Sequence, residues 1–285
     1  MLSVVICTRN RIGSLKQCLL FMIESARHFL RDWELIIVDN GCSSEISQEI
    51  STIAEVQLLP LVIIIEPLAG LSNARNRGLK YAKGEIVAFT DDDCWVDENW
   101  LDNIHEAFEQ NKDVALVGGR VDLANSRDAN ISVRSFDQDQ PVASFEDIQK
   151  YMIGCNFAVR KSAFDAVGGF DPYLGAGAVA KSAEDLDFFY RILTWGGVIH
   201  YSAACRIAHA HGRFEQAAIQ RQSANYIFGR GFWMAKRILM GESNFWRHIY
   251  WELVSAGKDF RVSHSLYLLG GLSTGFIVYA FRLRK

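Results

Sequence analysis

Short apolar runs alternate with amphipathic segments along the first hundred residues, and this alternation limits the possible folds more than any other feature. Apolar runs rich in β-branched residues indicate strands buried on both faces; they occupy residues 2–7, 34–38, 61–65 and 85–89. Helical spacing of apolar residues predicts helices between the runs, over residues 14–30, 45–54 and 72–81. Such alternation implies right-handed βαβ units. We therefore predict an α/β fold whose mostly parallel central sheet is flanked by helices.

The pattern is weaker after residue 110. The runs "VALVGG" (114–119) and "YMIGCNFAVR" (151–160) predict strands, and residues 185–195 have helical spacing that ends at Gly196. Residues 122–150 are polar, which predicts a substrate loop. In the first half, Ser72 is the predicted N-cap of the helix that runs to Tyr81.

Polar side chains follow three of the predicted strands. Thr8 and Arg9 follow the first strand, Asp39 follows the second, and the triplet Asp91–Asp93 follows the fourth. In a parallel sheet, ligands bind at the carboxyl ends of the strands, near a topological switch point. We therefore expect these residues, far apart in sequence, to meet at one edge of the sheet.

The triplet places three like charges in a row, and two interpretations of it stay open. Carboxylate oxygens suit Mg²⁺ or Mn²⁺, and such an ion neutralises charge on a leaving diphosphate. Alternatively, the triplet is a solvated acidic loop just before a helix N-terminus. No G-x-x-x-x-G-K-[ST] or G-x-G-x-x-G motif follows the first strand, which disfavours a P-loop or a Rossmann dinucleotide site.

A second pair of carboxylates, Glu184 and Asp185, lies at the start of the helix in "SAEDLDFFYRI". Acidic residues are common at helix starts because of the helix dipole. A carboxylate there is also placed to act as a base toward an attacking hydroxyl. Asp187 is expected to point elsewhere and to pair with Arg191, four residues on.

His209 and His211 follow a predicted strand, and alternation places both on the same face. One of them is a candidate metal ligand, and the alternative is a structural role for both.

Composition and charge exclude some classes of function. A net charge of −3 lacks the excess of positive charge that is typical of nucleic-acid-binding proteins. Six scattered cysteines without a C-x-x-C pair predict buried free thiols in a reducing compartment. The N-terminus has no signal-peptide pattern, so we expect a cytoplasmic protein.

Residues 265–281 carry no charge but contain glycine, serine and threonine. This length is the short limit for a membrane span, and a span would carry the terminal basic residues away from the cytosol. The preceding segment mixes basic residues with Trp233, Trp246 and Trp251, which suits a headgroup layer. We predict a helix that packs on the domain or lies in the interface of the inner face of the cell membrane; an ordinary amphipathic core helix is the alternative.

Four segments in order, "SVVICTRNR", "ELIIVDNGCSS", "GLSNARNRGLKYAKGEIVAFTDDDC" and "AEDLDFFYRI", resemble the inverting family 2 glycosyltransferases with the GT-A fold. The resemblance covers residues 2–212. It implies a GT-A domain over residues 1–212, with a nucleotide-binding half (1–110) and an acceptor-binding half (111–212). Residues 213–285 are then a helical C-terminal extension that is a candidate for membrane association.

The resemblance implies transfer of a sugar, of hexosyl or N-acetylhexosaminyl type, from a nucleotide-diphosphate donor to a glycan or lipid-linked acceptor. A UDP-sugar is the favoured donor, and Mn²⁺ or Mg²⁺ is the implied cofactor. The Q-x-x-R-W run of processive members is absent near "FGRGFWMAKR", which favours transfer of a single sugar.

Roles at the donor end follow from the resemblance alone. It implies that Thr8, Arg9 and Asp39 contact the nucleoside, and that Arg75 lies near the nucleotide. Asp91 or Asp92 is the implied contact to the ribose.

The resemblance also implies the metal and catalytic residues. Asp93 is the implied metal ligand, with Asp91 and His209 as further candidates. Asp185 is the implied general base, and Glu184 is expected to orient the acceptor.

Two other functions stay open. A sugar-phosphate nucleotidyltransferase also uses aspartates on an α/β sheet, but "CTRNRIGS" has only Gly13 where a glycine-rich loop is expected. A non-catalytic nucleotide-sugar-binding module is the other alternative, and the presence of both Asp93 and Asp185 argues against it.

Overall fold

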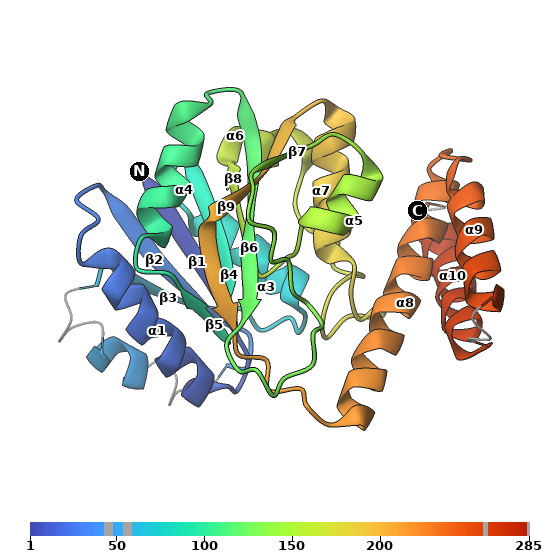
Figure 1. Cartoon of the computed structure of the whole chain (residues 1–285), viewed down its shortest axis with the longest axis horizontal. Helices are drawn as coiled ribbons and strands as arrows, with labels where there is room; N and C mark the ends of the chain where they lie inside the picture. Colours follow the sequence, from blue (N-terminus) through green and yellow to red (C-terminus); the bar gives the residue numbers. More distant parts are fainter. Residues whose placement is uncertain (43–47, 54–58, 259–261, 284–285) are drawn as a thin grey trace.

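The strands of the first half form a parallel sheet, as the alternation of strands and helices predicts (Figure 1). The computed structural model describes residues 1–42, 48–53, 59–258 and 262–283. Four neighbouring strands pair in parallel in the order β3-β2-β1-β4. Their bounds are β1 (Leu2–Thr8), β2 (Trp33–Asp39), β3 (Leu61–Ile65) and β4 (Ile86–Asp91).

Beyond β4 the sheet is mixed and continues in the order β8-β6-β9-β5. Strand β8 is antiparallel to both β4 and β6, whereas β9 is parallel to β6 and antiparallel to β5 and β7. The bounds of these strands are β5 (Cys94–Val96), β6 (Val114–Leu123), β7 (Gln140–Val142), β8 (Asn156–Arg160) and β9 (Val198–His209).

Two expectations for the second half are wrong in part. The predicted strand over residues 151–160 begins only at Asn156, in β8. Residues 122–150 are not a loop throughout, because they contain β7 and most of the short helix α5 (Phe145–Tyr151). Helix α5 starts where the Ser144 side chain accepts a hydrogen bond from the backbone N–H of Asp147.

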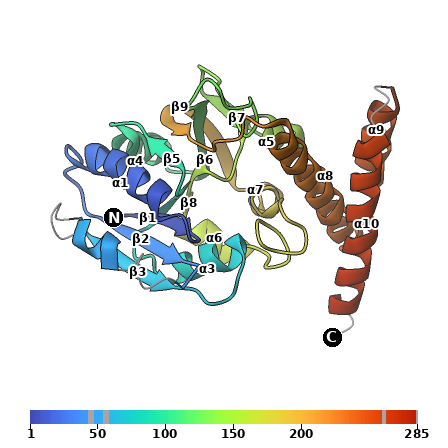
Figure 2. The same ribbon diagram turned by 90° about the horizontal axis from the view of Figure 1, so that it is seen from below.

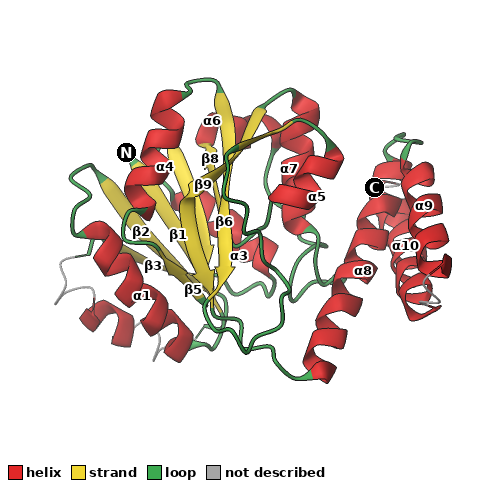
Figure 3. Ribbon diagram, in the orientation of Figure 1, coloured by secondary structure: helices red, strands yellow, loops and turns green. Residues whose placement is uncertain are grey.

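Helices cover both faces of the sheet (Figure 3). Alternate residues of β1 pack into two different hydrophobic clusters, one on each face of the sheet. Val4 and Ile6 pack in the same cluster as residues of α1 and α4, whereas Val5 packs with residues of α3, α6 and α7. This alternation is the two-residue period of a strand buried on both faces. The bounds are α1 (Ile12–Ala26), α3 (Leu71–Tyr81), α4 (Trp100–Gln110), α6 (Lys161–Val167) and α7 (Glu184–Trp195).

Two predictions for the first half need comment: the N-cap of α3 is not Ser72, and one predicted helix lies partly outside the described residues. Gly70, at a φ of 124°, is the N-cap of α3, and the Ser72 hydroxyl instead donates a hydrogen bond to the Leu174 carbonyl. A left-handed φ of this kind favours glycine at the cap. The predicted helix over residues 45–54 lies partly outside the described residues, and residues 48–53 are helical.

Three helices follow the sheet and stand beside it (Figure 2). They are α8 (Gln216–Leu239), α9 (Phe245–Lys258) and α10 (Val262–Leu283). Helices α8 and α10 lie so close together that a Cβ atom at Gly271 would be 2.0 Å from the Phe228 carbonyl oxygen. Helix α10 is long and apolar enough to cross a membrane by length and composition, a criterion that core helices of soluble proteins also meet; 28% of its apolar window is buried.

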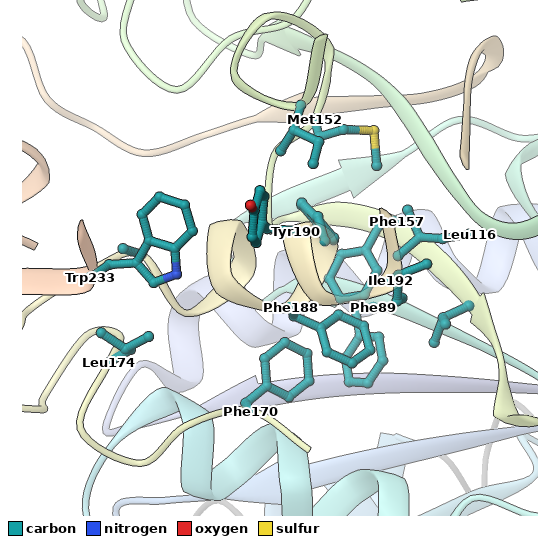
Figure 4. Close-up of a cluster of buried hydrophobic side chains, with 14 of the residues drawn as sticks. Phe89, Leu116, Met152, Phe157, Phe170, Leu174, Phe188, Tyr190, Ile192 and Trp233 are labelled. Carbon is teal, nitrogen blue, oxygen red and sulfur yellow. The ribbon is translucent and has the colours of Figure 1, made fainter. Parts of the chain in front are cut away.

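An aromatic cluster fixes α7 between the sheet and α8 (Figure 4). The ring centroids of Phe170 and Phe188 lie 4.5 Å apart, and those of Phe157 and Phe189 lie 5.0 Å apart. Tyr190 meets Trp233 of α8 edge to face at 5.4 Å. Because such cores are close-packed, these ring contacts hold α7 against β8.

Candidate active site

The register of the sheet brings the polar strand ends together, as expected. Thr8 is paired with Asp39 across β1 and β2, and Cys7 is paired with Asp91 across β1 and β4. A cavity of about 680 Å³ opens at this edge. All the predicted site residues except Asp39 line it: Thr8, Arg9, Arg75, Asp91, Asp92, Asp93, Glu184, Asp185 and His209.

Asp39 is fully buried, and among the described residues of this turn Asn40 lines the cavity. The Asp39 carboxylate accepts hydrogen bonds from the backbone N–H groups of Gly41 and Cys42. The Asn40 amide donates to the Glu66 carbonyl and accepts from the Gly70 N–H, 2.9 Å away. The turn after β2 is therefore fastened to the start of α3.

The aspartate triplet is not a solvated loop. Asp92 and Asp93 are 3% and 4% exposed. The Thr8 hydroxyl donates a hydrogen bond to Asp92 at 2.7 Å, and the Arg11 guanidinium pairs with Asp92 at 3.0 Å and with Asp93 at 2.6 Å. Buried carboxylates persist only where charges and donors compensate them. Of the two interpretations of the triplet, the structure favours a binding site.

The environments of Asp92 and Asp93 push their pKa values apart. Burial raises the pKa of Asp92 to about 7, although the Arg11 charge and the Thr8 hydrogen bond oppose the shift. Burial acts in the same direction on Asp93, but the hydrogen bond and charge of His209, together with Arg11, hold its pKa below the usual range. Asp93 therefore stays ionised when Asp92 does not.

One group of side chains has donors suited to a divalent metal ion. Ligand atoms of Asp93, Cys94 and His209 lie within 4.8 Å of one another, and all three residues are buried. Strand pairing places Cys94 opposite His209, whose Nε2 is 3.3 Å from an Asp93 oxygen. Burial lowers the pKa of His209, but surrounding acidic groups, Asp93 among them, outweigh it and raise the pKa to about 9. Carboxylate oxygens suit Mg²⁺ and Mn²⁺, and imidazole nitrogen suits transition-metal ions, so Asp93 is the donor of this group that best fits Mn²⁺.

His211 lies beside His209 but makes structural contacts. Its ring is 5.1 Å from that of His209. Its Nδ1 accepts a hydrogen bond from the Arg213 N–H at 3.0 Å, and its Nε2 lies 3.2 Å from the Ala129 carbonyl. His211 thus ties the segment after β9 to the segment after β6.

Arg75 joins the triplet to the second carboxylate pair. Its side chain is 2% exposed and pairs with Asp91 at 3.3 Å and with Glu184 at 3.0 Å. It also donates to the Gly154 carbonyl at 2.7 Å. Burial raises the pKa of Glu184 to about 7, helped by the charge of Asp185 and opposed by Arg75.

Asp185 lies at the first turn of α7 and lines the cavity. One carboxylate oxygen accepts a hydrogen bond from the backbone N–H of Leu186. The backbone of Gly154 lies so close that a Cβ there would be 2.8 Å from the other oxygen. Asp187 points away and pairs with Arg191 at 2.9 Å, as predicted.

Sequence reasoning missed several residues of the cavity. Arg11 lies in the segment "CTRNRIGS", but nothing in that segment indicates its ion pairs with the triplet. The polar segment after β6 lines the cavity, as its prediction as a substrate loop implies, but helix α8 lines it too, which no local pattern signalled. The cavity residues from these parts include Ser132, Arg134, Gln222, Tyr226 and Arg230.

The chain matches the family model of glycosyl transferase family 2 over residues 3–168. The chain belongs to this family. The resemblance inferred from the four motifs is therefore confirmed, and so is the predicted fold class.

Relatives with known names are also glycosyltransferases. The pre-mycofactocin glycosyltransferase of Mycobacterium tuberculosis is 27% identical over 218 residues, 73% of this chain and 42% of that protein. The chain thus spans less than half of that relative. The glucosyl-dolichyl phosphate glucuronosyltransferase of Haloferax volcanii is 25% identical over 251 residues, 83% of this chain and 76% of that protein.

Two solved structures have the same fold. The mannosyltransferase PcManGT of Pyrobaculum calidifontis, in complex with GDP-Man and Mn²⁺, superposes with a TM-score of 0.64 at 17% identity, covering 96% of this chain and 86% of that one. S. aureus TarS 1–349 in complex with UDP-GlcNAc superposes with a TM-score of 0.57 at 20% identity, covering 71% of this chain and 58% of that one.

Proposed function

We propose that the protein transfers a single sugar, with inversion, from a nucleotide-diphosphate sugar to a hydroxyl of a glycan or lipid-linked acceptor. One observation carries the proposal: the aspartate triplet, in which Asp92 and Asp93 are buried, and Asp185, from opposite ends of the domain sequence, line the same cavity. A transfer of this kind needs a site for the diphosphate and a base for the acceptor, and the cavity offers carboxylates for both.

The donor end of the cavity is the edge at β1, β2 and β4. Thr8, Arg9 and Asn40 lie where a nucleoside would be held, and Asp91 or Asp92 would contact the ribose. Asp39 then acts indirectly, by fixing the turn that carries Asn40. That PcManGT is in complex with GDP-Man, and TarS with UDP-GlcNAc, supports a nucleotide-sugar donor, and we favour a UDP-sugar.

Asp93 and His209 would hold a divalent cation, Mn²⁺ or Mg²⁺, with Asp91 nearby in the triplet. When bound, the ion supplies positive charge to the diphosphate leaving group. Asp93 is suited to this role because its low pKa keeps the carboxylate ionised. Arg11, which pairs with Asp92 and Asp93, lines the same part of the cavity and would add a second positive charge near the diphosphate.

Asp185 would accept the proton of the attacking hydroxyl, and Glu184, which also lines the cavity, would help to orient the acceptor. Arg75 holds Glu184 in place through an ion pair of 3.0 Å. A single in-line displacement by the acceptor inverts the configuration at the sugar carbon and needs no enzyme nucleophile. The polar loop after β6 and helix α8 close the acceptor end.

The substitution Asp185→Asn tests this assignment. We expect it to leave donor affinity unchanged and to lower transfer at least about 100-fold, because general-base catalysis contributes that much. Transfer is measured as release of nucleoside diphosphate from the donor in the presence of acceptor. The control is Asp165→Asn on the exposed side of α6, which should behave as wild type. Undiminished transfer by the Asp185 variant would reject the base role.

We also propose that the protein works at the cytoplasmic face of a membrane, with residues 213–285 as a helical, membrane-associated extension of a GT-A domain over residues 1–212. Large apolar side chains are exposed on α9 and α10. Among them are Trp246, Tyr250, Leu266, Ile277 and Phe281. Aromatic and aliphatic side chains on one helical layer suit the headgroup boundary of a bilayer.

A further inference from the structure

The cationic side chains that line the cavity are of two kinds: those that pair with a carboxylate and those that do not. Arg11 and Arg75 pair with carboxylates of the cavity itself, and Arg230 of α8 pairs with Glu252 outside it. Four other cations line the same cavity, and within the described part of the chain none of them pairs with a carboxylate. Arg9 follows β1 at the donor end, and the other three are Arg134, Lys181 and Arg213. Unpaired cations in a cleft attract an anion from solution.

Arg134 is held in the cavity at an energetic cost. Its guanidinium donates to two backbone carbonyls, those of Val133 and Gln149, while its buried Nε has no hydrogen-bond partner among the described residues. Burial lowers the pKa of Arg134, and the charge of Asp185 only partly offsets this effect. A charged group kept part-buried without a carboxylate partner indicates a ligand that supplies the missing charge.

The other groups gather around the same end. Tyr226 of α8 shares a hydrogen bond of 2.6 Å with Ser132, and the charges of Arg213 and Asp185 both act on its hydroxyl. Lys181 precedes α7 and lies 5.3 Å from the centre of the Phe228 ring of α8. Arg134, Lys181 and Arg213 therefore lie at the end of the cavity that holds Asp185, whereas the aspartate triplet lies at the donor end.

We propose that this end of the cavity binds a phosphate group carried by the acceptor, between Arg134, Lys181 and Arg213. This inference rests on the proposed function, because it takes Asp185 as the group that contacts the acceptor hydroxyl. A phosphate suits the site better than a carboxylate does: it brings three acceptor oxygens and a charge of about −1.5 to −2. Two guanidinium groups, an ammonium and the Tyr226 hydroxyl offer more donors than one carboxylate can accept.

The donor diphosphate is the other possible source of this anion, and charge helps to separate the two. The diphosphate and its divalent cation bring charges that largely offset each other, and the triplet is already compensated by Arg11 and Arg75. Binding of the donor thus leaves the three cations without an anion. An acceptor with a phosphate near its reacting hydroxyl would supply the negative charge that these cations lack.

The test titrates inorganic phosphate by calorimetry into the full chain saturated with UDP or GDP and Mn²⁺. We expect phosphate to bind, and Arg134→Gln and Arg213→Gln each to weaken its affinity about tenfold, as the loss of one charge-assisted contact predicts. Nucleotide affinity should stay within about twofold in both variants. The matched control is Arg221→Gln on α8, which is exposed and outside the cavity lining, and it should change neither affinity.

Two results would overturn the inference: no binding of phosphate to the nucleotide-loaded protein, or variants that lose nucleotide affinity while phosphate affinity is unchanged. The second result would assign the cations to the donor. If neither nucleotide binds, the proposed function fails, and phosphate titrated into the free protein still decides whether Arg134 and Arg213 form an anion site.

Vesicles separate a lipid-borne phosphate from a water-soluble one. Phosphatidylcholine vesicles with and without phosphatidic acid are sedimented with wild type and with both arginine variants. A loss of phosphatidic acid binding in Arg134→Gln and Arg213→Gln identifies a lipid headgroup as the source. Equal binding of all three proteins, with the calorimetric loss retained, identifies a water-soluble phosphate ester.

Discussion

At the scale of single residues, Arg11 and Arg75 explain how five carboxylates share one cavity. Arg11 holds Asp92 and Asp93, and Arg75 holds Asp91 and Glu184. Asp185 alone among the five has no ion pair in the described part of the chain. The free carboxylate is the one that we propose as the base, which is the group that must accept a proton.

Gly154 offers a residue-scale prediction. A Cβ at this position would lie 2.8 Å from an Asp185 oxygen and 2.9 Å from its Cβ atom, so Gly154→Ala must displace the carboxylate. We expect turnover to fall about 100-fold, the effect of a misplacement near 1 Å, with donor affinity unchanged. Gly13→Ala is the control, because no atom lies within 4 Å of its added Cβ. Equal turnover in both variants would contradict the assigned position of the base.

The sequence predicted which residues line the site better than it predicted their contacts. Thr8 and Asp91 could be placed because parallel strands end at one edge of a sheet. The inward position of Asp39 depends on hydrogen bonds within its own turn, and the position of Arg134 depends on a segment without periodicity. Such contacts between residues far apart in the chain leave no local pattern to read.

At the scale of elements, a buried polar network attaches α7 to the C-terminal helices. Lys236 of α8 pairs with Asp187 of α7 and with Asp171, each at 2.8 Å. Trp233 also donates to Asp187, and Tyr279 of α10 donates to Asp171 at 2.7 Å. Helices α8 and α10 therefore fix the helix that begins with Glu184 and Asp185.

Asp171 links this network to pH. Burial acts to raise the pKa of Asp171, but the Lys236 charge and hydrogen bonds from Lys236 and Tyr279 lower it below the ordinary value of 3.8. The folded state thus binds fewer protons than the unfolded state, so stability rises with pH. The contribution of Asp171 is present above pH 3.8 and is lost as pH falls through the folded pKa.

We therefore expect Asp171→Asn to reduce the free energy of unfolding by about 3 kcal/mol near neutral pH, because it breaks a buried ion pair. At acid pH below 3.8, where Asp171 begins to take up its proton, the difference from wild type should become smaller. Urea denaturation at both pH values measures it, with Asp113→Asn, an exposed aspartate, as the control. A difference that does not depend on pH would show that charge at Asp171 is not the cause.

Elements with a strong period were predictable, and short ones were not. The strands β1, β2 and β4 and the helix α7 follow runs long enough to show their period. Strand β7 has three residues and α5 has seven, too few to distinguish from a polar loop. The mixed order beyond β4 depends on the pairing of β8 and β9 with distant strands, which alternation does not encode.

At the scale of the whole molecule, the exposed apolar side chains of α9 and α10 predict binding to a lipid surface. Trp246 stacks on Phe276 across the two helices, and Ile277 next to it is 60% exposed. We expect the double variant Trp246→Ala, Ile277→Ser to lower affinity for phosphatidylcholine–phosphatidylglycerol vesicles about tenfold or more, in proportion to the apolar area lost.

Co-sedimentation with vesicles measures this effect, and Trp195→Ala on α7 is the control, because Trp195 is equally exposed away from α9 and α10. Substitution is a better test than deletion of α10, since Leu268 and Leu272 are buried against the rest of the protein. Wild-type protein that does not sediment with vesicles would reject the membrane proposal and leave the transfer proposal intact.

The most direct test of the central claim is calorimetric titration of wild type and Asp93→Asn with UDP-GlcNAc and with GDP-mannose, each with and without Mn²⁺. The claim predicts that wild type binds one of these nucleotide sugars, and that omission of Mn²⁺ or loss of the Asp93 charge weakens binding at least about tenfold. Affinity that is the same with and without Mn²⁺, and in the variant, would contradict metal-assisted binding of a nucleotide sugar at the aspartate triplet.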